Sequence, residues 1–159
     1  MLLPFSARFA QLDASKEAIP FGTARDFAAY LREARAAIAS VVSDPTLGLT
    51  RNGFIIDPQE LRTPNPFDVG SVATALAFID RGLVSRVGAG DRRAVGSYGL
   101  KHAAEKWGRE NGFEPYVGNG DFIAAIVWRK IPYRRDGGRS PNCQVGLRYV
   151  SRHRGGGVA

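Results

Sequence analysis

The chain has 159 residues, of which 44% are hydrophobic and 23% charged, and this composition excludes a disordered protein. No apolar run reaches the roughly 18 to 20 residues that cross a bilayer, and the first residues lack the basic and apolar regions of a signal peptide. We therefore expect a cytoplasmic protein without a membrane partner, with a single globular domain over residues 1–151 and a frayed basic, glycine-rich tail over 152–159. The one cysteine, Cys143, excludes an internal disulfide and a zinc site of several cysteines.

The whole net charge of +7 lies in the last quarter of the chain. Residues 1–121 hold 14 basic and 14 acidic residues, whereas residues 122–159 hold eight basic residues and a single acid, Asp136. Seven of those eight are arginine, whose planar guanidinium suits bidentate contact with phosphate or carboxylate and stacking on aromatic faces. We expect this end of the chain to meet a partner, although a solvated basic surface would have the same composition.

Apolar residues at helical spacing predict a first helix in the region that begins at Thr23, a good N-cap. The apolar residues recur at intervals of three and four from Phe27 to Val41, and charged residues lie off this stripe. The helix is predicted to end at 44–45, where an aspartate precedes a proline.

A second helix is predicted to be capped by Asp68 and stopped by Gly82. The segment before it, residues 45–67, is rich in Pro, Gly, Asn and Thr. This composition indicates a long connection, and its short apolar run at 54–56 is consistent with an edge strand.

A third helix is predicted to start at Ser97 and to end near Gly112. Lys101 and Glu105 stand four residues apart, and we place this pair on the outer side of the helix. A fourth helix begins at Asn119, presents apolar residues such as Phe122 and Ile126 to the core, and is closed by Pro132.

The C-terminal region predicts a β-hairpin. Residues 131–135 form its first strand, a turn surrounds the glycines that follow Asp136, and residues 144–150 alternate in the manner of a second strand. The fold class is therefore α+β, with about four helices and a short C-terminal antiparallel hairpin packed on them.

The order helix, turn, helix and basic hairpin over 97–150 is the outline of a winged helix, in which the second helix enters the major groove. Two features weaken this interpretation. The connection between Gly112 and Asn119 is longer than a tight helix-turn-helix allows, and residues 121–125 are acidic and apolar where base-reading residues belong.

The candidate contact residues are cations and one aromatic residue near the end of the fourth helix and in the hairpin. Cations there would neutralise phosphates, and neighbouring aromatic rings would stack on bases or anchor the hairpin to the core. The set is Arg129, Lys130, Tyr133, Arg134, Arg135, Arg139 and Arg148.

For every other motif, the sequence favours a structural interpretation over a functional one. The glycines around Ala89 lack the strand and the further residues of a phosphate loop, so they indicate a connector. His102 and His153 have no second ligand at metal spacing, and Cys143 is expected to be an inert, partly buried thiol. We therefore expect no metal, no cofactor and no catalytic residue.

Two segments, Ser97 to His102 and Tyr116 to Ala125, resemble parts of small proteins of phages and plasmids. The resemblance implies the role of a mobile-element accessory protein, and it carries no activity with it.

Two functions fit these residues. The first is a non-enzymatic protein that binds DNA or RNA through its arginine-rich helix end and hairpin. The second is an accessory or inhibitor protein whose basic face docks on an acidic protein or nucleoprotein partner.

Overall fold

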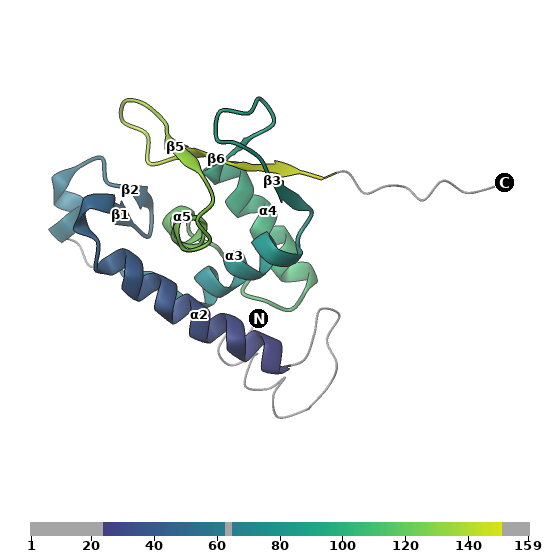
Figure 1. Ribbon diagram of the computed structural model, residues 1–159. Coiled ribbons are helices and arrows are strands. Elements are labelled where there is room, and N and C mark those ends of the chain that lie inside the picture. Colours follow the sequence, from purple (N-terminus) through teal and green to yellow (C-terminus); the bar gives the residue numbers. More distant parts are fainter. Residues whose placement is uncertain (1–23, 63–64, 151–159) are drawn as a thin grey trace.

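The helices predicted from apolar spacing are present in the computed structural model, which describes residues 24–62 and 65–150. Within these ranges the four α-helices are α2 (Ala24–Val42), α3 (Val69–Arg81), α4 (Ser97–Glu110) and α5 (Asn119–Trp128). Short strands and two 3-10 helices, η1 (Pro45–Leu47) and η2 (Pro58–Arg62), connect them (Figure 1). The α+β class is thereby confirmed, whereas the predicted cap Thr23 and the tail 152–159 lie outside the described residues.

Helix α5 forms the centre of the fold, and in Figure 1 it is seen end-on among the other elements. All residues from Asn119 to Ile126 are buried, which requires packing on every side of the helix. Helices α2, α3 and α4 and the first hairpin all contact it. Aromatic side chains fill the neighbouring space, with Phe78 and Phe122 at a centroid distance of 6.2 Å.

The strands form small antiparallel sheets around this helix. One hairpin pairs β1 (Leu49–Thr50) with β2 (Gly53–Phe54), and this is where an edge strand was predicted. The C-terminal hairpin pairs β5 (Tyr133–Arg135) with β6 (Cys143–Val145), and β4 (Val95–Gly96) joins the other edge of β6. A separate pair joins β3 (Val84–Arg86) to β7 (Leu147–Tyr149).

The predicted strand over 144–150 is wrong in one respect, because it is broken at Gly146. A Cβ atom at this position would press against the Val87 carbonyl oxygen and the Pro132 ring. The Gly146 backbone binds both neighbours, since its N–H donates to Pro132 O and its carbonyl accepts from the Val87 N–H. Gly146 is therefore the point at which the chain leaves one sheet and joins the next.

The helix ends agree closely with the predictions. Asp68 caps α3 by accepting a hydrogen bond from the Ser71 N–H at 2.8 Å, and Gly82 ends the helix. The N-caps of α4 and α5 are Gly96 and Gly118, one residue before the predicted positions.

The winged-helix interpretation is wrong, because its recognition helix would be α5. That helix lies in the core, so its residues cannot reach base edges in a groove. The acidic and apolar start of this segment, which weakened the interpretation from the sequence, reflects its burial. None of the helices in the described ranges is both long and apolar enough to cross a membrane.

Candidate functional site

Arg129, the first predicted contact residue, is held by two partly exposed carboxylates of neighbouring helices. Its Nε and Nη2 donate to the two oxygens of Asp80 at 2.9 and 2.8 Å, and its Nη1 and Nη2 donate to Glu33. The indole N–H of Trp128 also donates to Glu33, at 2.9 Å. The hydrogen bond from Arg129 holds the pKa of Glu33 below its ordinary value, against the opposing effect of burial. The charge of Arg129 is therefore matched within the fold, and its role is to tie α5 to α2 and α3.

Lys130 follows directly and is exposed, with a backbone φ of 54° in the left-handed region. Its N–H donates to Val127 O, and the N–H of Ile131 donates to Ile126 O. These two bonds are the Schellman motif that closes a helix, in which the left-handed position is usually glycine. Among the described residues, Lys130 is the one non-glycine residue with a positive φ.

The two arginines of β5 have different surroundings. Arg134 pairs with Gln144 in the sheet, on the side opposite to the buried residues Cys143 and Val145, so it points outward. Arg135 lies over the ring of Phe54, with its guanidinium carbon 4.3 Å from the centroid. The ring of Tyr133 also stacks on Phe54, with a distance of 5.8 Å between the ring centroids. Tyr133 therefore anchors the hairpin to the core.

Two further predicted residues lie on the surface. Arg139 is exposed in the loop between β5 and β6. Arg148 is next to the buried Leu147 in β7 and opposite Ser85, so it faces outward from that sheet. The pKa of Asp91 is lowered to about 2, mainly by the hydrogen bond from Arg93, and the charge of Arg148 lowers it further.

The structure thus divides the predicted set into two groups. Arg129, Tyr133 and Arg135 make contacts that hold the fold together. The others have no ion pair within the described ranges, and we name them the C-terminal cations: Lys130, Arg134, Arg139 and Arg148.

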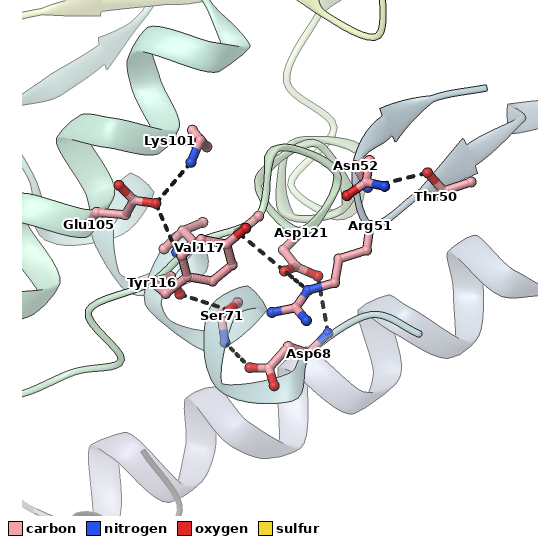
Figure 2. A network of polar contacts seen from close by, with 11 residues as sticks. Thr50, Arg51, Asn52, Asp68, Ser71, Lys101, Glu105, Tyr116, Val117 and Asp121 are labelled. Carbon is pink, nitrogen blue, oxygen red and sulfur yellow. Dashed lines mark hydrogen bonds and ion pairs between the residues drawn. The ribbon is translucent and has the colours of Figure 1, made fainter. Parts of the chain in front are cut away.

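A second polar region, which the sequence did not single out as a site, surrounds the N-terminal end of α5 (Figure 2). Asp121 is fully buried there, and it accepts hydrogen bonds from the Asp68 N–H at 3.1 Å, the Gly118 N–H at 3.2 Å and Arg51 Nε at 3.0 Å. Burial raises the pKa of Asp121 to about 6, although these donors and the Arg51 charge oppose the shift. The carboxylate joins three segments that are distant in the sequence.

The turn of the first hairpin is pressed against the same helix end. The Gly120 N–H donates to the Arg51 carbonyl at 2.8 Å, and a Cβ atom at Gly120 would collide with the carbonyl oxygen of Thr50. The Asn119 amide donates to Asn52 O at 3.2 Å and to Asn142 Oδ1 at 2.9 Å. Only glycine at position 120 allows this contact, which also sets the position of Arg51.

Helix α4 contributes a buried ion pair beside this end. Lys101 Nζ donates to Glu105 Oε1 at 2.9 Å, and these residues are only 7% and 9% exposed. The predicted pair is confirmed, but its placement on the outer side is wrong. The Val117 N–H donates to the same oxygen at 3.2 Å, and His102 Nδ1 lies 3.0 Å from Glu105 Oε2. The segment after α4 folds back over the pair, which the spacing within one helix cannot reveal.

Two exposed tyrosines flank the ammonium group of Lys101. The nitrogen lies 5.4 Å from the ring centroid of Tyr98 and 5.3 Å from that of Tyr116. The guanidinium of Arg51 lies 5.4 Å from the Tyr116 ring. We name these four residues the tyrosine–cation cluster. The two tyrosines lie 18 positions apart in the chain, and no sequence pattern indicates that they meet at one cation.

Among the described residues, the remaining candidates for chemistry do not form a site. Cys143 is fully buried, more deeply than predicted, and burial raises the pKa of its thiol to about 11. Over residues 24–62 and 65–150, no three His, Cys, Asp or Glu side chains gather in a way that could hold a metal ion. In comparisons with known proteins, no family model, no curated protein and no solved structure matches this chain.

Proposed function

We propose that this protein binds nucleic acid without catalysing a reaction, and that the C-terminal cations make the phosphate contacts. The observation that supports the proposal is the absence of an ion pair at all four cations within the described ranges, in contrast to Arg129. A cation already paired with two carboxylates, as Arg129 is, gains little from a phosphate. A cation without such a partner releases condensed counterions from the nucleic acid on binding. The proposed setting is the cytoplasm, in the role of a phage or mobile-element accessory protein.

The backbone at Lys130 favours this proposal. A left-handed conformation costs a non-glycine residue about 1 kcal/mol, and the Schellman motif would be more stable with glycine. Strain of this kind is a reason to look for a function of the side chain. The exposed ammonium of Lys130, beside the strand that carries Arg134, would supply a phosphate contact in return for that cost.

The first experiment removes two of these charges and compares the result with the removal of two others. We expect Arg134→Ala/Arg139→Ala to weaken binding to a DNA or RNA oligonucleotide, measured by fluorescence anisotropy at several salt concentrations. The slope of log affinity against log salt is negative, and its magnitude should decrease by about 2, since each phosphate contact contributes roughly 0.9. The matched control is Arg32→Ala/Arg35→Ala on α2, two exposed arginines whose loss should leave the slope unchanged.

A second variant separates binding from stability. Lys130→Gly should raise the free energy of unfolding by about 1 kcal/mol, because it relieves the left-handed strain, and should still weaken binding. Absence of binding to both DNA and RNA at low salt would overturn the proposal, as would equal losses in the test and control pairs. A stable complex with an acidic protein in the absence of nucleic acid would replace it with the second function.

A further inference from the structure

The tyrosine–cation cluster combines exposed rings with a deeply placed cation. Tyr98 and Tyr116 are 55% and 54% exposed, whereas Lys101 between them is 7% exposed. Isolated exposed aromatic residues are common on protein surfaces and need no explanation. Here, however, two exposed rings flank one ammonium group, and a guanidinium lies over the second ring, so aromatic rings and cations are grouped at one place on the surface.

Hydrogen bonds with helices α3 and α4 hold the main chain of the cluster at Tyr116 and Val117. The Tyr116 carbonyl accepts a hydrogen bond from the Ser71 hydroxyl at 2.8 Å, and the next residue, Val117, donates to Glu105. Arg51 has 27% of its side chain exposed, whereas its partner Asp121 is fully buried. Figure 2 shows the two side chains pointing toward each other. At this part of the cluster the cation faces solvent and its counter-charge lies beneath it, so the local field favours an anion.

The cluster also borders the sheet that carries one of the C-terminal cations. Arg134, Gln144 and Gly96 lie side by side on neighbouring strands, on the outer face of that sheet. Gly96 carries no side chain, and the position of its missing Cβ lies 3.9 Å from the Gln144 amide nitrogen. Tyr98 follows Gly96 by two residues, so the row that begins at Arg134 ends two residues before the first ring of the cluster.

We infer that the tyrosine–cation cluster is a stacking platform for unpaired bases, and that the nucleic acid bound by this protein is single-stranded there. This inference rests on the proposed function. Every base has a π-face that stacks on an aromatic ring, and cations beside the rings hold the backbone. Both ring centroids lie within 5.4 Å of one nitrogen atom, so neighbouring bases of one strand can each use a ring. A duplex keeps its bases stacked inside and gains nothing from these rings.

The experiment compares a short oligothymidylate with a duplex of the same length. Tyr98→Ala and Tyr116→Ala should each lower affinity for the single strand about 5- to 150-fold and leave duplex affinity unchanged. Tyr98→Phe keeps the ring and should bind as the wild type does. The matched control is Tyr149→Ala, which removes a tyrosine of similar exposure, 49%, outside the cluster. A strand containing 2-aminopurine should lose fluorescence on binding to the wild type, and Tyr98→Ala should abolish this stacking signal.

The outcomes distinguish the two proposals. Selective loss of single-strand affinity with retained duplex affinity supports the platform. If the wild type binds neither probe, the proposed function fails and the platform with it. If the wild type binds and Tyr98→Ala has no effect, or lowers affinity for both probes equally, the platform is overturned while the proposed function stands. Thermal unfolding of each variant identifies a loss that comes from misfolding.

Discussion

Helix α5 offers a carboxylate to an arginine at its N-terminal end, whereas at its C-terminal end it offers an arginine to two carboxylates. Asp121 meets Arg51 of the first hairpin, and Arg129 meets Glu33 of α2 and Asp80 of α3. Both charges suit the helix dipole, which favours an acid in the first turn and a base at the last. The same kind of contact therefore ties the central helix to its neighbours at both ends.

The two ends differ in how much backbone takes part. At the N-terminal end the hairpin turn touches the helix main chain through Gly120, and the side chain of Asp121 has no exposed surface. At the C-terminal end the contacts are made by side chains, and Arg129 keeps 16% of its side-chain surface exposed. Side chains adjust to a change more easily than backbone does, so we expect the N-terminal end to tolerate substitution less.

The largest effect is expected from Gly120→Ala. The added methyl group meets the Thr50 carbonyl oxygen, so the hairpin must move away from the helix and the bond to Arg51 O must lengthen. We expect the free energy of unfolding to fall by about 3 kcal/mol, measured by urea denaturation. Gly137→Ala is the control, because no atom lies within 4 Å of the added carbon. Equal stability of the two variants would show that the close approach at Gly120 does not constrain the fold.

A smaller effect is expected from Arg129→Met at the other end. This change keeps an unbranched side chain but removes the guanidinium, so Glu33 and Asp80 lose their shared partner. We expect a loss of about 2 kcal/mol in the same measurement, since hydrogen bonds between charged groups are lost at partly buried positions. Arg134→Met removes an unpaired exposed arginine and should change stability by less than about 0.5 kcal/mol. A similar loss in both variants would contradict the division between structural and free arginines.

Much of the fold could be predicted because its signals are local. The stripe from Phe27 to Val41 and the cap at Asp68 involve residues within a few positions of one another, and the structure has a helix at each. The C-terminal hairpin was also predicted, because strand alternation and turn glycines are local signals.

The candidate site was harder to predict because it depends on contacts between distant segments. The sequence does not distinguish Arg129 from the C-terminal cations. Only the fold brings Glu33 and Asp80 into contact with Arg129. The burial of the Lys101–Glu105 pair depends in the same way on a distant segment. The chain after α4 folds back, and the Val117 N–H donates to Glu105. Periodicity reports which face of a helix is apolar, and it does not report which charges that face will meet.

The pH dependence of stability gives the smallest effect and the sharpest contrast between the two ends. The pKa of Asp121 is raised from 3.8 to about 6, so the folded state binds this proton more tightly than the unfolded state does. Its contribution to stability is fully present below about pH 4 and is lost as pH rises through 6. The pKa of Glu33 is lowered from 4.5, so its contribution is present above that value and is lost as pH falls.

The test compares variants that cannot titrate at one end. Between pH 5 and pH 7, wild type should lose about 1 kcal/mol of unfolding free energy relative to Asp121→Asn. Over the same range the difference between wild type and Glu33→Gln should stay constant, and it should shrink only as pH falls below about 4.5. A wild type that gains stability relative to Asp121→Asn as pH rises would reverse the sign. It would show that the three donors to Asp121 outweigh its burial, and that both ends of α5 respond to acid in the same way.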